Sequence, residues 1–245
     1  PDASVYVKLF FLAALKCATL DQRQAGLEME AGKPGWNDAL NGLPGLFGSS
    51  SSECADLLML LRRLRDWSTR TEIAFPSELI DFVRRVDLLL RRFDFCREPS
   101  PGFWRASVEL REEWREKVYS GRLYGGYENV AREELLEIVF GFIRLVEAGL
   151  RRVESSSGML DTYFVNELSA SDGPEGSKSR TLPLFLEGQA KLMCVFPEET
   201  PMIHRLVEKS PLYDSKLKMY RICAPLGEES PELGRIMAFT PGVFE

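Results

Sequence analysis

The sequence predicts a mainly α-helical protein, and three observations lead to this fold class. Four segments repeat apolar residues at helical spacing, namely Glu53–Trp67, Ser77–Phe93, Phe103–Tyr119 and Arg132–Val153. A fifth segment, Val5–Thr19, is apolar apart from two lysines. No run of strands alternates with these helices, so nothing indicates parallel βαβ units.

The predicted helices of the first half follow from local signals. Val5–Thr19 has apolar residues on every side, as a helix buried in a larger assembly does. Glu53–Trp67 has leucines on one side, at positions 57, 60, 61 and 64, and the serines before it can supply its N-cap. Ser77 is the expected N-cap of the helix that runs to Phe93. The segment 28–52 is rich in Gly, Pro, Asn and Ser, and it is predicted to be a long structured loop.

The second half continues the helical pattern and then changes character. Phe103–Tyr119 has two tryptophans as packing anchors, and Arg132–Val153 has the most regular apolar spacing in the chain. Residues 155–180 are predicted to be a flexible insertion that contains a strand-like segment, Thr162–Val165. A short helix is expected around Met202–Glu208. We expect residues 1–245 to form one partial domain that is truncated at both ends.

Composition excludes several classes of function. The net charge is −6 and the pI is about 5.2, so no basic field attracts nucleic acid or an anionic membrane. The five cysteines are scattered without a C-x-x-C pair, which is typical of reduced thiols in a cytoplasmic protein. No metal site is expected, because the chain has a single histidine and no suitable cysteine spacing. No signal peptide and no membrane span are predicted.

The segment that carries chemistry is 33–52, which reads KPGWNDALNGLPGLFGSSSS. Its one acid, Asp38, lies among an aromatic ring, Trp36, and two carboxamides, Asn37 and Asn41. An aromatic plate and paired amide groups suit a sugar, and a carboxyl group beside an aromatic wall favours its protonated form. The pattern therefore predicts a proton donor in a sugar site. The structural alternative is a glycine-rich loop that caps the helix starting near Glu53.

The stretch Gly35-Trp36-Asn37-Asp38-Ala39-Leu40-Asn41 is similar to the D-W-N-D-G-M-N motif of glycoside hydrolase family 94, which contains the cellobiose phosphorylases. Its longer form, K-P-G-W-x-D-A-L-N-G-L-P-G-L-F-G-S, looks closest to the 1,2-β-oligoglucan phosphorylase branch. Two later stretches also resemble the family: LPLFLEG at 182–188, and AFTPGVFE at 238–245, which resembles the start of a P-G-x-x-E-N motif. Gly35 replaces the first Asp of the shorter motif, and Ala39-Leu40 replaces Gly-Met.

The resemblance implies a fold, an activity and a set of site residues. The fold would be part of an (α/α)6 barrel, and the general acid would be Asp38. Trp36, Asn37 and Asn41 would shape the sugar site, and Glu245 would be a further sugar-site residue. The reaction would be inverting phosphorolysis of a β-linked glucan to α-glucose 1-phosphate.

The resemblance also bears on ligands and assembly. Inorganic phosphate would be the co-substrate, no cofactor would be needed, and the family's phosphate-binding histidine would lie past residue 245. We expect the 245 residues to be a fragment that is inactive alone, and a homodimer is one assembly that the sequence leaves open.

Two other functions remain open from the sequence. An inverting glycoside hydrolase on the same fold would need a second carboxylate to hold a water molecule. A non-catalytic helical binding domain would use the loop only as structure. Glu187 is singled out only by the family-like stretch around it. His204 has no orienting partner nearby in the sequence and is not predicted to be catalytic.

Overall fold

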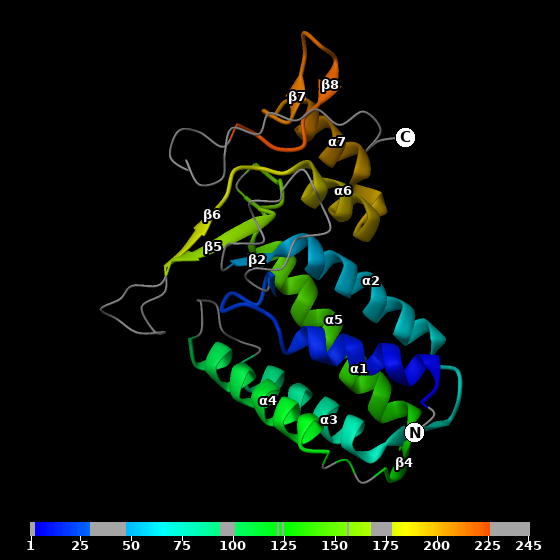
Figure 1. The fold of residues 1–245 in the computed structure, drawn as a ribbon. Helices are drawn as coiled ribbons and strands as arrows, with labels where there is room; N and C mark the ends of the chain where they lie inside the picture. Colours follow the sequence, from blue (N-terminus) through cyan, green and yellow to red (C-terminus); the bar gives the residue numbers. More distant parts are fainter. Residues whose placement is uncertain are drawn as a thin grey trace. The chain divides into compact units, whose positions relative to one another are not determined.

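The computed structural model describes residues 3–29, 48–93, 101–121, 123, 125–155, 157–167 and 178–225. The chain divides into two compact units (Figure 1). Unit 1 comprises residues 1–27 and 57–149, and unit 2 comprises residues 28–56 and 150–245. The described part is mainly helical, which confirms the predicted fold class.

The helices lie close to their predicted positions. They are α1 (Val5–Cys17), α2 (Ser51–Trp67), α3 (Ser77–Phe93), α4 (Pro101–Tyr119), α5 (Arg132–Arg152), α6 (Leu186–Val195) and α7 (Thr200–Glu208), with a 3₁₀ turn at Pro197–Glu199. For the region of α6 the sequence predicts only an apolar stretch, because its few polar residues do not define a helical spacing. No described helix is long and apolar enough to cross a membrane.

Short strands join segments that are distant in the sequence. A four-stranded sheet has the order β1 (Leu27–Met29), β2 (Gly48–Ser50), β5 (Tyr163–Glu167) and β6 (Lys178–Thr181). Strands β3 (Glu72–Pro76) and β4 (Tyr127–Ala131) form an antiparallel pair, as do β7 (Tyr213–Asp214) and β8 (Met219–Tyr220). Residues 155–180, predicted to be a flexible insertion, thus supply β5 and the first part of β6, while 168–177 lie outside the described residues.

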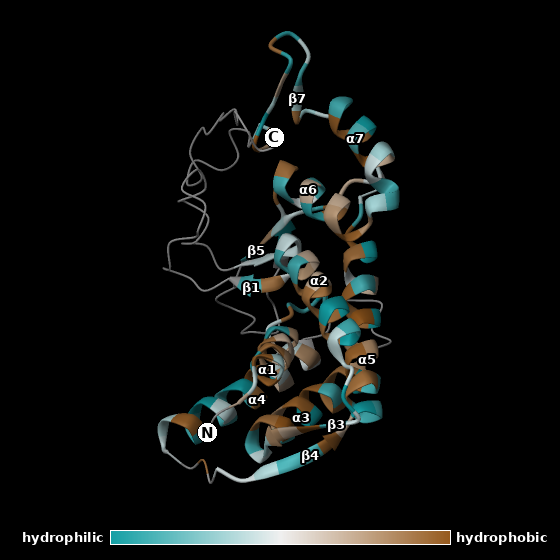
Figure 2. Cartoon of the chain, turned by 90° about the vertical axis from the view of Figure 1, so that its right-hand side faces the viewer, coloured by the Kyte–Doolittle hydropathy of each residue, from teal (hydrophilic) through white to brown (hydrophobic). Residues whose placement is uncertain are grey.

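Apolar helix faces form the core of unit 1. Helix α1 packs on α3, and α3 packs on α4; the hydrophobic residues of these helices appear brown in Figure 2. The ring of Trp114 lies 5.2 Å from that of Phe11 and 5.1 Å from that of Phe82, measured between centroids. Trp114 is therefore the packing anchor that its helical position predicted.

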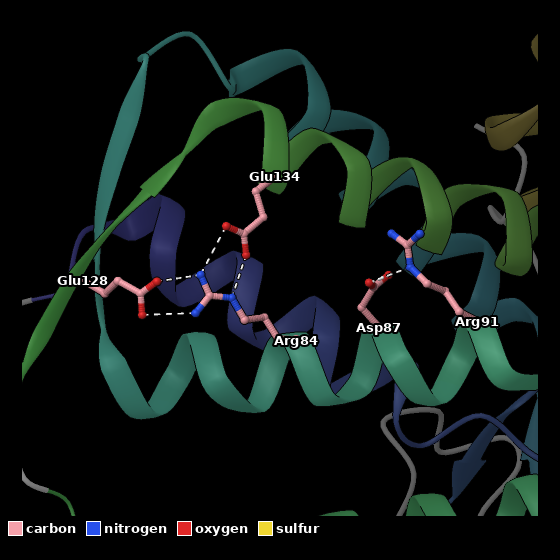
Figure 3. Close-up of polar contacts among 5 residues, drawn as sticks. All are labelled: Arg84, Asp87, Arg91, Glu128 and Glu134. Carbon is pink, nitrogen blue, oxygen red and sulfur yellow. Dashed lines mark hydrogen bonds and ion pairs between the residues drawn. The ribbon is translucent and has the colours of Figure 1, made fainter.

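An ion-pair network in unit 1 joins α3 to β4 and α5 (Figure 3). The guanidinium of Arg84 donates two hydrogen bonds to Glu128 and two to Glu134, over distances of 2.6 to 3.2 Å. About two turns later on α3, Arg91 Nε donates to Asp87 Oδ2 over 2.7 Å. The planar fork of an arginine makes such paired bonds to two carboxylates possible, whereas a lysine could not reproduce them.

Arg84→Met should lower the free energy of unfolding by about 1 kcal/mol at pH 7. This value is near the upper end for partly exposed ion pairs, because Glu128 and Glu134 both lose Arg84 as their partner. The hydrogen bonds from Arg84 hold the pKa of Glu128 below its usual 4.5. The stabilisation by Arg84 is therefore complete above the pKa that Glu128 has in the unfolded chain. It is lost as the pH falls through the lower pKa that Glu128 has in the folded protein.

Urea titrations of both proteins from pH 7 down to pH 3 would measure the difference. The matched control is Arg115→Met, which removes a single exposed pair with Glu112 on α4 and should cost less than about 0.5 kcal/mol. An Arg84→Met effect that stays constant down to pH 3 would contradict the electrostatic explanation.

Candidate functional site

The residues predicted to form the sugar site lie outside the described part of the chain. Asp38, Trp36, Asn37 and Asn41 belong to residues 30–47, and Glu245 belongs to residues 226–245. The described residues do include those directly before and after the segment 30–47, namely Met29 and Gly48. They also include the second family-like stretch, residues 182–188.

Residues 30–47, which include Asp38, follow strand β1 and precede strand β2 in the sequence, and these two strands are neighbours in the four-stranded sheet. Strand β1 ends at Met29 and β2 begins at Gly48. Strand β2 pairs antiparallel with β5, with Ser50 opposite Tyr163. Directly after β2, the backbone N–H of Ser51 donates to the Thr162 carbonyl over 2.9 Å, and the Ser51 hydroxyl donates to the Asp161 carbonyl over 2.6 Å. Main-chain and side-chain hydrogen bonds thus fix the start of α2, directly after β2.

A buried polar cluster lies where β2 ends, and we call it the Glu187 cluster: Glu187, Tyr163, Ser52 and Ser50. The Ser52 hydroxyl donates to Glu187 Oε1 over 3.0 Å, and the Tyr163 hydroxyl donates to Oε2 over 2.5 Å. The Ser50 and Ser52 hydroxyl oxygens are 2.7 Å apart. Tyr163 and both serines are buried, and Glu187 is partly buried. Each oxygen of the carboxylate therefore accepts a hydrogen bond from a hydroxyl that is shielded from water.

The two residues after Glu187 explain how α6 comes so close to the sheet. A Cβ atom at Gly188 would lie 2.2 Å from Thr162 Oγ1 and 3.1 Å from Thr162 Cβ, so only glycine permits this approach. The fully buried amide of Gln189 accepts from the Leu160 N–H over 3.0 Å and donates to the Leu160 carbonyl over 2.7 Å. Gly188 and Gln189 thus hold the first turn of α6 against Leu160 and Thr162, just before β5, and Glu187 is placed beside Tyr163.

The electrostatics of the cluster follow from its burial. Loss of water raises the pKa of Glu187 above its usual value, against the opposing effect of the Tyr163 and Ser52 hydrogen bonds. Burial also raises the pKa of the Tyr163 hydroxyl, and the neighbouring Glu187 carboxylate adds to this, so Tyr163 stays protonated and acts as a donor. One helical turn from Glu187, the ammonium of Lys191 is paired with Asp56 over 2.7 Å.

Sequence reasoning missed most of this cluster. Glu187 was noted only for the resemblance of its surroundings, and Tyr163 and Ser52 were not selected at all. A usable signal was present, because Glu187, Gln189 and Lys191 are polar residues within the mainly apolar stretch 182–195. Polar side chains in a buried helix need partners, which marks them for a hydrogen-bonded role.

His204 has partners that its sequence neighbourhood did not reveal. Its Nε2 lies 3.0 Å from the Tyr220 hydroxyl, and its Nδ1 lies 3.8 Å from Glu208 Oε2. The assumption that this histidine lacks an orienting partner is therefore wrong. Its side chain is 43% exposed, and burial raises the pKa of the Tyr220 hydroxyl, which keeps this hydroxyl protonated.

Other places in the described residues offer less to a ligand. A hollow of about 700 Å³ lies along one side of α4, lined by Glu109, Glu112, Glu113, Arg115, Glu116, Tyr119 and Ser120. These residues come from α4 and the residue that follows it, and four are acidic, so within the described residues no second element closes over a substrate. Among the described residues, no three His, Cys, Asp or Glu side chains converge as metal ligands do.

Comparison with known proteins adds no assignment to this geometry. No model of a known protein family matches the chain, and no curated protein matches its sequence. Two features of the chain remain as indications of its function, the motif around Asp38 and the contacts of the Glu187 cluster.

Proposed function

We propose that this chain carries the general acid of an inverting glycoside phosphorylase, with Asp38 as the proton donor and Trp36, Asn37, Asn41 and Glu245 contacting the sugar. The substrates are a β-linked glucan and inorganic phosphate. The helical units are, on this proposal, part of an (α/α)6 barrel, and the protein is cytoplasmic and needs no cofactor.

One observation carries the proposal beyond the motif alone. Two stretches that resemble the same enzyme family, 33–49 and 182–188, are more than 130 residues apart in the sequence. In the fold, Ser52, three residues after the first stretch, donates a hydrogen bond to Glu187 in the second. A chance match of a short segment would give no reason for the second stretch to contact a residue that follows so closely after it. The contact supports a shared functional origin for both.

The chemistry requires one carboxyl group in the loop. Asp38 protonates the glycosidic oxygen as the bond between that oxygen and the anomeric carbon breaks. A phosphate oxygen forms the new bond to the same carbon from the opposite face, which inverts its configuration and gives α-glucose 1-phosphate. Phosphate is already an anion, so its attack needs no general base. A hydrolase of the same stereochemistry would need a second carboxylate to activate water.

The test is the phosphate dependence of the reaction, measured with the full-length natural protein and short β-glucans of different linkages. We expect α-glucose 1-phosphate to appear only when phosphate is present, in step with a glucan shortened by one unit. Free glucose formed at the same rate without phosphate would replace the proposal by an inverting hydrolase. No product from any glucan, together with glucan binding, would instead favour a non-catalytic binding domain.

A further inference from the structure

The carboxylate of Glu187 is held by hydroxyl groups and not by a cation. Its two oxygens accept hydrogen bonds from the buried hydroxyls of Ser52, at the start of α2, and Tyr163, on β5. The ammonium of Lys191, one turn later on α6, instead bonds both carboxylate oxygens of Asp56. Among the described residues, Glu187 is therefore bonded by neutral donors alone, and these donors join α6 to two other elements.

The direction of the hydrogen bonds in this cluster follows from counting protons. A hydroxyl group has one proton to donate, and Ser52 donates its own to Glu187. The 2.7 Å contact between the Ser50 and Ser52 oxygens must therefore use the proton of Ser50. The two serines thus form a chain of hydroxyl groups in which each proton points toward the carboxylate.

Protonation of Glu187 can reverse this chain without moving its oxygen atoms. A proton from water forms an O–H bond at Oε1, and the carboxyl group then donates to the Ser52 oxygen. The Ser52 hydroxyl turns its own proton to Ser50, whose proton turns away, while Tyr163 still donates to Oε2. A guanidinium in the place of Ser52 could not follow this change, because it has no acceptor. The contacts of Glu187 with both hydroxyls are therefore kept in either protonation state.

The surroundings of Glu187 favour its uncharged form. Loss of water raises the pKa of Glu187, and the carboxylate of Glu53 on α2 adds to this, against the hydrogen bonds of the two hydroxyls and the charge of Lys191. Lys191 is itself paired with Asp56 of α2, and Tyr163 on β5 stays protonated because burial raises the pKa of its hydroxyl. These are the charged and titratable groups that act on Glu187 from α2, β5 and its own helix.

We propose that the Glu187 cluster is a proton-sensitive junction of unit 2, in which uptake of one proton by Glu187 reverses the hydroxyl chain to Ser50 and binds α6 more firmly to β5 and to the start of α2. Because the pKa of Glu187 is higher in the folded protein than in the unfolded chain, the junction is most stable below the unfolded value. It weakens as the pH rises through the folded value. This junction does not depend on the proposed function, since it needs no substrate.

The first experiment titrates Glu187 in the full chain, through the NMR chemical shift of its side-chain carboxyl carbon, in wild type and in Ser50→Ala. The signal is identified by its loss in Glu187→Gln. We expect a pKa above the usual 4.5 in wild type and a lower pKa in Ser50→Ala, because the Ser52 proton then lacks the Ser50 oxygen as its acceptor in the acid form. Burial alone predicts the opposite direction, since alanine is less polar than serine.

Glu199 gives the internal control in the same spectra. It belongs to the same unit, and its hydrogen bonds from Arg151 hold its pKa below the usual value. Its titration should be identical in wild type and Ser50→Ala. A pKa of Glu187 at or below 4.5 in wild type would overturn the junction. An unchanged or raised pKa in Ser50→Ala would also overturn it, because Glu187 would then be a buried carboxyl group without the hydroxyl chain.

A second measurement follows the attachment of α6 directly. The Leu160 amide donates to Gln189 on α6, so its hydrogen exchange reports opening of this junction. Wild type is compared with Glu187→Gln, which copies the uncharged form, at each pH because the intrinsic exchange rate also rises with pH. We expect wild type to lose protection relative to the variant by up to about tenfold per pH unit, between the unfolded and folded pKa values of Glu187. The same pH course in both proteins would show that α6 does not respond to the proton.

Discussion

Asp38→Asn should lower kcat for glucan phosphorolysis by about 100- to 10,000-fold, the usual contribution of a general acid. Asparagine has nearly the same shape as aspartate and keeps a hydrogen bond to the glycosidic oxygen, but it cannot transfer a proton to that oxygen. KM for the glucan should change little, because contacts that are equal in the ground state and the transition state are retained. Initial rates with saturating phosphate would measure the effect.

The choice of leaving group gives the internal control for this variant. In an aryl β-glucoside with an acidic phenol, the phenolate can leave without being protonated. Asp38→Asn should therefore lose far less activity on such a substrate than on a glucan. Asp66→Asn, on the exposed side of α2, should behave as wild type on both substrates. Equal losses on the two substrates would show that Asp38 binds the sugar or supports the loop and does not act as the acid.

The helices could be predicted because their signals are local. The spacing of Val83, Val86 and Leu90 on α3 defines one buried face, and the helix has the predicted bounds, Ser77–Phe93. The other predicted helices differ from the observed ones by about two residues at an end. Capping residues and apolar spacing act over a few residues, so a single sequence is enough to reveal them.

The pairing of distant strands could not be predicted in the same way. Strand β3 pairs with β4 more than 50 residues later, with Phe75 opposite Glu128. Nothing in either short segment specifies its partner, because a strand of five residues matches many others in period and propensity. The contact of Ser52 with Glu187 has the same origin, since it depends on β2 lying beside β5.

The candidate site could be predicted only where a motif concentrates its residues. Trp36, Asn37, Asp38 and Asn41 are within six positions of one another, and their chemistry can be inferred from the letters. Glu187 and Tyr163 become significant only once the fold brings them together. Gly188 shows the same limit. Only glycine fits at this position because Thr162 lies so close, and this contact cannot be read from the neighbouring residues in the sequence.

Gly149→Ala should destabilise unit 1 by about 1–3 kcal/mol, the usual cost of overpacking a dense interior. Gly149 lies near the end of α5, where a Cβ atom would be 2.0 Å from the Gln24 carbonyl oxygen and 3.2 Å from Ala25 Cα. These are backbone atoms, which cannot turn aside as the end of a side chain can. Gln24 is itself held in a left-handed conformation with φ of 55°, so the turn that meets α5 has little room to adjust.

Gly141→Ala, on the same helix, makes the matched control and should have the opposite sign. Its Cβ atom would lie 3.6 Å from Asp87 Oδ1, an ordinary contact, so the substitution should stabilise α5 by about 0.5–1 kcal/mol through helix propensity alone. Urea midpoints at unchanged slope would measure both variants. Because the chemical change is identical, a difference in sign can come only from the contact of Gly149 with the Gln24 turn. If both variants were stabilised equally, α5 would not approach that turn as closely as described.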